Sequence, residues 1–296
     1  MREGMISVPG GRVWYGIEGE GGIPLVCLHG GPGFPHDYLE PLAELADERA
    51  VVFFDQLGCG RSDRPTDENL WTLDRALEEV ERVRSELELD AFHLLGSSWG
   101  GLLAIEYALT QPPGLRSLVL SSPLVSVPRW NQDAAELKAQ LPADVRATID
   151  WHEERGFVDC PEYTAATLVF WKRHVCRLER WPDELERSFA GFNVGPYRTM
   201  WGPSEFTQTG NLAGRDPSGR LHELTVPVLW SCGRYDEARP DSTEHFHTLT
   251  PSSEFHVFEH SAHSSHLEER ELYLRLLRDF LQRVEAGLFD LTTGAS

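Results

Sequence analysis

The chain has 296 residues, of which 41% are hydrophobic and 25% are charged, as in an ordinary globular protein. Its net charge of −20 comes from 47 acidic and 27 basic residues and argues against a nucleic-acid partner, because phosphate binding needs a basic face. No apolar run approaches the ~18 residues of a membrane span, so we expect no membrane partner either.

The first half of the chain predicts strands that alternate with helices. Met5–Glu18 alternates between apolar and polar residues and breaks at Pro9-Gly10-Gly11, which predicts a hairpin. Helical patterns cover Leu73–Leu89 and Trp99–Thr110. Short apolar runs without alternation, typical of strands buried on both faces of a parallel sheet, lie at Pro24–Leu28, Ala50–Phe54, Phe92–Leu95 and Leu115–Leu120. This order predicts an α/β fold with a mostly parallel, doubly wound sheet.

The alternation stops after Pro123. The stretch 124–221 is helical in pattern and rich in aromatic residues, and it contains no strand-like run. Strands and helices then resume at Val226–Ser231, Asp241–Leu249, Glu254–Phe258 and, as a last amphipathic helix, about Leu267–Val284. We therefore predict a core made of residues 1–123 and 222–296, with a helical cap inserted over 124–221.

The clearest chemical motif is Gly96-Ser97-Ser98-Trp99-Gly100-Gly101, which fits G-x-S-x-G. A predicted strand precedes it and a predicted helix follows it, which is the context of a nucleophile elbow. The flanking glycines suit a tight, strained turn. Ser98 is therefore the predicted nucleophile of an α/β hydrolase.

A serine nucleophile needs a base, and the base needs an acid that orients it. Asp236 follows the strand that ends near Ser231, on the sheet edge where open α/β sheets bind ligands. Three histidines follow the last strand. His263, in the middle of a loop of small residues, is the first choice for the base; His266 is the alternative, and His260 is close enough to the strand to belong to it. A metal site at the three histidines lacks a second set of ligands.

An oxyanion hole needs backbone N–H donors. Trp99, directly after the nucleophile, should supply one. The loop His29-Gly30-Gly31-Pro32-Gly33 resembles the HGGG-type loop of lipases and esterases, and Gly31 is the first choice for the second donor. His29 is expected to be structural, and Gly30 and Gly33 leave room for the approach of a carbonyl group.

With these motifs the chain resembles the proline iminopeptidase (prolyl aminopeptidase) family of α/β hydrolases, especially its tricorn-interacting aminopeptidase branch. The matching segments are 29–33, 55–62, 96–101, 202–207, 233–237 and 261–263. The resemblance implies that the helical insertion caps the active site and that Glu205 and Glu237 bind the free α-amine of the substrate. Glu205 could instead be a solvated cap residue, and Glu237 could pair with Arg234 or Arg239.

These residues predict a serine aminopeptidase that releases N-terminal residues, proline or others, from short peptides, arylamides or amino-acid amides through an acyl-enzyme. The alternatives are an ester, lactone or amino-acid amide hydrolase of the same fold, or a non-catalytic binding protein. We expect no metal and no cofactor, because there is no phosphate loop and no H-E-x-x-H, and Gly58-Cys-Gly60 lacks the third glycine of a dinucleotide site. Five unpaired-looking cysteines and the absence of a signal pattern favour the cytoplasm; the sequence does not give the oligomeric state.

Overall fold

The computed structural model describes residues 1–289, and their strands form an eight-stranded sheet in the order β1-β2-β4-β3-β5-β6-β7-β8. The first pairings, β1 with β2 and β2 with β4, are antiparallel, and all the others are parallel. The strands are β1 (Arg2–Val8), β2 (Gly11–Glu18), β3 (Leu25–Leu28), β4 (Val51–Phe54), β5 (Phe92–Ser97), β6 (Leu115–Ser121), β7 (Val228–Gly233) and β8 (Ser253–Phe258). The predicted α/β fold and its opening hairpin are confirmed.

The central strands are apolar throughout because each of their faces is covered by a separate core layer. In β3, Val26 and Leu28 pack into one layer, and Leu25 and Cys27 pack into the other. Side chains alternate across a strand, so a strand covered on both faces needs apolar residues at every position. The first layer is completed by α1 (Leu73–Glu86), α2 (Trp99–Ala108) and α8 (Pro240–Thr248), and the second by the 3-10 segment η1 (His36–Asp47) and α10 (Arg270–Glu285).

The end of the chain differs from the prediction of one continuous helix over Leu267–Val284. The structure has a short helix α9 (Ser265–Glu268) and then α10, separated at Glu269, whose φ of −124° and ψ of 47° are not helical. The Glu269 carboxylate turns back to accept hydrogen bonds from the His260 backbone N–H (3.0 Å) and the Ser261 hydroxyl (2.6 Å). The helix is interrupted at Glu269 because this side chain folds back to bind residues 260–261, in the loop before α9.

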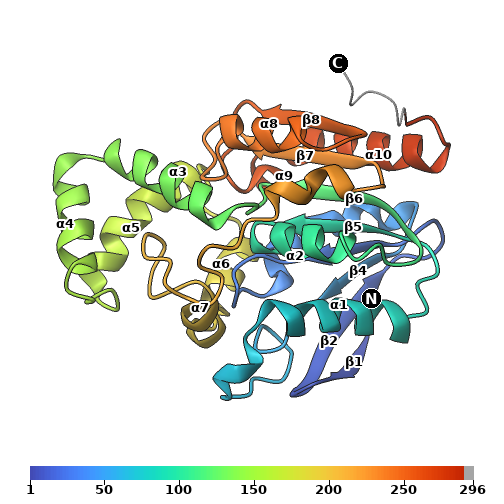
Figure 1. Ribbon diagram of the computed structural model, residues 1–296, viewed down its shortest axis with the longest axis horizontal. Helices are drawn as coiled ribbons and strands as arrows, with labels where there is room; N and C mark the ends of the chain where they lie inside the picture. Colours follow the sequence, from blue (N-terminus) through green and yellow to red (C-terminus); the bar gives the residue numbers. More distant parts are fainter. Residues whose placement is uncertain (290–296) are drawn as a thin grey trace.

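Between β6 and β7 the chain forms a group of helices that stands to one side of the sheet (Figure 1). They are α3 (Val127–Ala139), α4 (Ala143–Glu153), α5 (Pro161–His174), α6 (Asp183–Ala190) and α7 (Val194–Met200), followed by the 3-10 turn η3 (Ser218–Glu223). Helices α3 to α5 share a small core of their own that includes Ile149, Tyr163 and Phe170. The domain limits at 123/124 and 221/222 stay a prediction, and residues 290–296 of the predicted core lie outside the described residues.

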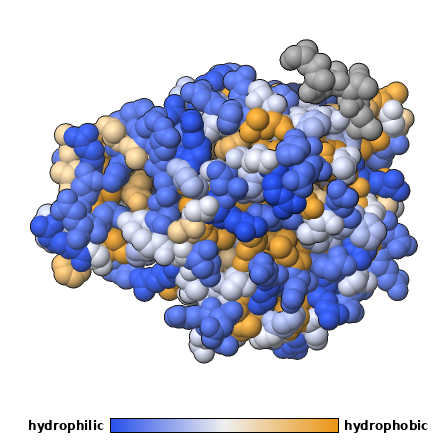
Figure 2. Space-filling view, viewed as in Figure 1, coloured by the Kyte–Doolittle hydropathy of each residue, from blue (hydrophilic) through white to orange (hydrophobic). Residues whose placement is uncertain are grey.

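The surface of the molecule is mostly hydrophilic on the face that Figure 2 shows, with apolar side chains in small groups. This agrees with the charged fraction of 25%. Within residues 1–289, none of the helices has the length and apolar character that crossing a membrane requires.

Candidate active site

Ser98 lies at the turn between β5 and α2, where strand geometry changes to helix geometry within one residue. Its backbone has φ 57° and ψ −122°, a sparsely populated conformation for a residue other than glycine. The turn is held by hydrogen bonds from the Ser98 N–H to the Ser121 carbonyl (3.2 Å) and from the Gly101 N–H to the Ser98 carbonyl (2.8 Å). The predicted elbow therefore has the strained backbone that presents a nucleophile at a helix N-terminus.

Asp236, which is buried, and His263, which is partly buried, form a hydrogen-bonded pair on the loops after β7 and β8. His263 Nδ1 lies 2.7 Å from Asp236 Oδ1. Asp236 also accepts hydrogen bonds from the backbone N–H groups of Ala238 (2.8 Å) and Gly233 (3.2 Å), so its carboxylate is fixed by its own loop. This arrangement makes Nδ1 the donor to Asp236 and directs Nε2 into the cavity that Ser98 also lines. Both side chains line the same cavity, and within residues 1–289 no hydrogen bond joins Ser98 to His263.

The two other candidate histidines have different surroundings. His266 is buried, and its Nε2 donates to the Tyr38 carbonyl at 2.9 Å; burial lowers the pKa of His266 to about 4. It does not line the cavity of Ser98. His260 is exposed beyond the end of β8. The geometry therefore supports His263 as the base, and within the described residues no set of three His, Cys, Asp or Glu side chains forms a metal site.

The loop after β3 places Gly30 and Gly31 beside Ser98. A Cβ on Gly30 would stand 2.9 Å from the Ser98 Cβ, so only glycine fits at this approach. The Gly30 N–H donates to the Tyr38 hydroxyl at 2.7 Å. The N–H groups of Gly31 and Trp99 have no hydrogen-bond partner among residues 1–289, and both residues line the cavity. Two free donors beside a nucleophile are what an oxyanion hole requires.

Gln56, which the motif analysis did not single out, ties the two sides of this candidate oxyanion hole together. Its side chain accepts from the Trp99 indole N–H (2.9 Å) and donates to the His29 carbonyl (3.1 Å). Its backbone N–H donates to His29 Nε2 (2.9 Å), and His29 is fully buried, as expected for a structural residue. Gln56 lies in the segment 55–62, which matched the resembled family, so a signal for it was present.

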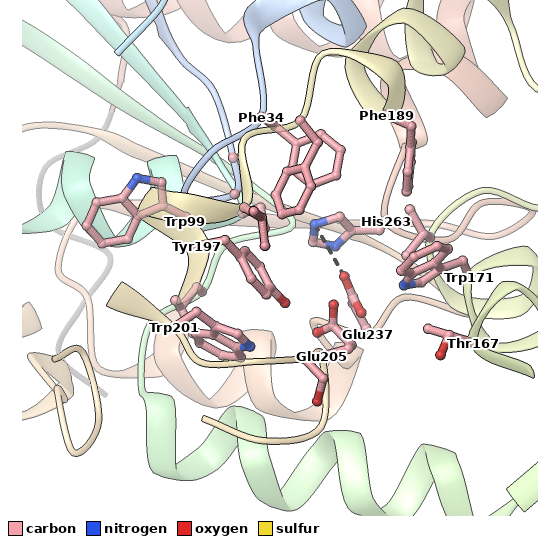
Figure 3. A pocket seen from close by; sticks show the side chains of 18 of the residues that line it. Phe34, Trp99, Thr167, Trp171, Phe189, Tyr197, Trp201, Glu205, Glu237 and His263 are labelled. Atoms are coloured by element: carbon pink, nitrogen blue, oxygen red, sulfur yellow. Dashed lines mark ion pairs between the residues drawn. The ribbon is translucent and has the colours of Figure 1, made fainter. Parts of the chain in front are cut away.

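A cavity of about 260 Å³ opens over Ser98 and is walled by the inserted helices. Figure 3 shows its aromatic walls, with Tyr197 and Trp201 on one side and Trp171 and Phe189 on the other. Among the described residues that line it, none is Lys or Arg, whereas Asp159, Glu205 and Glu237 are acidic. The lining of the cavity is thus mostly apolar with acidic groups. Gly33, which is not part of this lining, joins the loop after β3 to the inserted segment by accepting the Asn193 N–H at 2.9 Å.

Glu205 and Glu237 are brought together at this cavity, although one comes from the inserted segment and the other from the loop after β7. Figure 3 shows both carboxylates beside His263, and Glu237 Oε1 lies 3.8 Å from His263 Nε2. Glu237 Oε2 is buried without a hydrogen-bond partner among residues 1–289. The arginines that could have paired with Glu237 bind elsewhere, Arg234 to Glu259 and Arg239 to Glu136.

Among residues 1–289, neither carboxylate forms an ion pair with a Lys or Arg side chain, and the basic group that lies beside Glu237 is the imidazole of His263. Burial, with the negative charges of Glu205 and Asp236, raises the pKa of Glu237 well above its usual value. Burial also raises the pKa of Glu205, and the charge of His263 and contacts with Trp130 and Tyr197 oppose this shift. A bound cation would remove this cost by supplying the missing charge.

The C-terminal end of α5 is hydrogen-bonded to the loops that carry Asp236 and His263, a connection that no motif indicated. The His174 carbonyl accepts the N–H groups of Glu237 (3.3 Å) and His263 (3.2 Å), and the His174 ring Nδ1 donates to the Tyr235 carbonyl (2.8 Å). The inserted helices therefore contribute to the position of the base as well as to the walls of the cavity.

Comparison with known proteins places this geometry in a family. A family model described as "alpha/beta hydrolase fold" matches residues 23–270. A proline iminopeptidase of Heyndrickxia coagulans is 49% identical over 285 residues, which are 95% of this chain and 99% of that protein. Among solved structures, VinJ has a TM-score of 0.92 at 36% identity and covers 96% of this chain and 99% of its own. A proline iminopeptidase of Mycobacterium smegmatis has a TM-score of 0.89 at 35% identity, with 97% and 99% covered.

Proposed function

The chain belongs to the proline iminopeptidase family of α/β hydrolases, and from this premise we propose that it is a serine aminopeptidase acting on short peptides, arylamides or amino-acid amides. The observation that carries the proposal is the pair of carboxylates beside His263, the buried Glu237 and the partly buried Glu205, with which no Lys or Arg of residues 1–289 forms an ion pair. An N-terminal ammonium is the cation that would complete it, through charge-assisted hydrogen bonds.

In the proposed reaction, Ser98 Oγ attacks the carbonyl carbon of the first residue. His263 Nε2 takes the hydroxyl proton and gives it to the leaving amine, while Asp236 stabilises the imidazolium through Nδ1. The N–H groups of Gly31 and Trp99 stabilise the oxyanion. Water, activated by His263, then attacks the acyl-enzyme, releases the free amino acid and restores Ser98.

The substrate's ammonium determines which acyl groups bind with their carbonyl carbon at Ser98. Because Glu237 follows Asp236 in the chain and lies 3.8 Å from His263, an amine bound to Glu237 puts the adjacent carbonyl near the base and nucleophile. The ester and lactone hydrolase alternatives need no such charge pair, and a non-catalytic role leaves the Asp236–His263 pair and the free N–H donors without a purpose. The proposed substrates carry proline or another residue at the N-terminus.

We place the cap at residues 124–221, because α3 to α7 lie between β6 and β7 and α3, α5, α6 and α7 contribute residues to the lining of the cavity. We place the protein in the cytoplasm, because its five cysteines are free, as a reducing compartment would keep them.

The test compares substrates with and without the amine. Glu205→Gln should lower kcat/KM on prolyl and alanyl arylamides by about 10²-fold, because the substrate's ammonium loses one of its carboxylate partners. The same variant should change hydrolysis of a simple acetate ester little. The control is Glu162→Gln, an exposed glutamate in the first turn of α5. Equal losses on the arylamides and the ester would reject the amine-binding role.

A further inference from the structure

Glu153, the last residue of α4, accepts hydrogen bonds from three hydroxyl groups, and two of the donors, Tyr163 and Ser204, line the cavity. Ser204 Oγ donates to Glu153 Oε1 at 2.6 Å. The Tyr163 hydroxyl donates to the same oxygen, and the Thr207 hydroxyl donates to Oε2. Ser204 and Tyr163 are buried, whereas Glu153 and Thr207 are partly exposed, so these bonds are partly shielded from solvent.

This position is unfavourable for a carboxylate on local grounds. Glu153 stands at the C-terminal end of α4, where the helix dipole is negative. None of the ion pairs among residues 1–289 includes Glu153, since Lys138 binds Asp150 and Arg155 binds Glu154. A residue that violates a helix rule without a cation to compensate it is often retained for a functional reason.

The hydroxyls of Ser204 and Thr207 both belong to the segment that contains Glu205, so Glu153 is hydrogen-bonded to that segment at two points. Ser204 and Thr207 flank Glu205 in a tight turn, joined by an isolated β-bridge and by a long hydrogen bond from the Thr207 N–H to the Ser204 carbonyl (3.4 Å). This turn has little regular structure of its own. Its side chains on both sides of Glu205 are tied to Glu153, which belongs to a helix.

We propose that Glu153 is a positioning residue for amine recognition: it anchors the Ser204–Thr207 turn, so that the Glu205 carboxylate is held where the substrate's ammonium binds. The inference rests on the proposed function. The amine site then consists of Glu205 and Glu237 at the cavity and Glu153 behind them. Glu153 does not touch the substrate but holds Glu205, which does. An anchored carboxylate binds more tightly because less conformational freedom is lost on binding.

The experiment measures KM and kcat separately for Glu153→Ala on an aminoacyl arylamide and on an acetate ester. The expected result is a rise in KM of about 10-fold for the arylamide, equivalent to one hydrogen bond to a charged group, with kcat and ester hydrolysis within about 2-fold of wild type. Glu153→Gln, which keeps an acceptor for Ser204 and Tyr163, should recover part of the loss. The matched control is Glu154→Gln, the neighbouring glutamate, whose side chain is 73% exposed.

A double variant separates positioning from general stability. If Glu153 acts through Glu205, then Glu153→Ala should add little to the loss already caused by Glu205→Gln. Equal losses on both substrates, full additivity, or Glu153→Gln as impaired as Glu153→Ala would overturn the positioning role. Should Glu153→Ala fail to fold, Ser204→Ala with Thr207→Val removes the same tethers and should give the same pattern.

The two proposals fail differently. If Glu205→Gln is selective for amine substrates and Glu153→Ala is not, only the role of Glu153 is rejected. If Glu205→Gln shows no selectivity, the amine site is rejected and the positioning role falls with it.

Discussion

Ser98, the proposed nucleophile, has a strained backbone with φ 57° at the N-terminus of α2. We expect Ser98→Ala to lower kcat by about 10⁴- to 10⁶-fold, because the remaining donors and binding contacts cannot replace a nucleophile. The measurement is single-turnover hydrolysis of an arylamide, with thermal unfolding as the control for an intact fold. A folded variant with near-wild-type turnover would contradict the assignment of Ser98.

The carboxylate pair predicts a pH dependence that is specific to amine substrates. The pKa of Glu205 and that of Glu237 are both raised, so as pH falls the pair becomes protonated earlier than ordinary carboxyls and loses its attraction for an ammonium. The ratio of kcat/KM for an arylamide to that for an ester should therefore decrease as pH falls, starting above pH 4.5. Taking the ratio removes any pH effect on the hydrolytic step that both substrates share. A ratio constant from pH 7 to 4.5 would contradict the prediction.

At the scale of elements, Gly100 lets α2 pack directly against the end of β3 and the start of the loop that contains Gly31. A Cβ on Gly100 would stand 2.3 Å from the Leu28 carbonyl oxygen and 2.8 Å from that of His29. The helix that carries Ser98 therefore lies directly against the end of β3, and the distance between nucleophile and oxyanion donors depends on this contact.

We expect Gly100→Ala to push α2 away from β3, with a loss of about 1–3 kcal/mol in the free energy of unfolding, as in other overpacked sites, and a fall in kcat on every substrate. Gly219→Ala is the matched control, because a Cβ there meets no atom within 4 Å, and its effect should stay within about 0.5 kcal/mol. Urea unfolding and steady-state kinetics measure both effects. Unchanged kcat in Gly100→Ala would show that the contact does not set the site.

At the scale of the whole molecule, the buried His93 links the central strand β5 to the neighbouring strand β6 and to α10, the last long helix. His93 of β5 lies 2.7 Å from Ser117 Oγ and 3.0 Å from Glu285 Oε1 at the end of α10, and Glu285 also binds Arg49. Burial lowers the pKa of His93 to about 4. The folded chain therefore keeps this histidine neutral at pH values where the unfolded chain protonates it.

Because the folded pKa lies below the usual 6.5, the contribution of His93 to stability is present above pH 6.5 and is lost as pH falls toward 4. The loss is roughly 3 kcal/mol over that window, at about 1.4 kcal/mol per pKa unit. His93→Gln should flatten the pH dependence of urea unfolding between pH 7 and 5, although it lowers stability at pH 7. His245→Gln, on an exposed position of α8, should leave the slope unchanged. A slope as steep in His93→Gln as in wild type would show that other groups cause the acid sensitivity.

Much of this protein could be predicted from local patterns. Apolar runs without alternation predicted the central strands, because strands covered on both faces need apolar residues throughout. The elbow at Ser98 was predictable because a strand, a tight turn and a helix are consecutive in the chain. The 3-10 segment η1 and the helix break at Glu269 were not, because they depend on contacts with other segments.

The sequence by itself determined the fold, the family and the candidate nucleophile, since all three rest on residues that are close together in the chain. Tertiary structure alone decided which histidine meets Asp236, since His263 and His266 differ only in what packs around them. It also brought together Glu205 and Glu237, placed Glu153 behind the first, and tied His174 to both catalytic loops. These relations join segments that are far apart in the chain, and their distances are set by how the helices pack over the edge of the sheet.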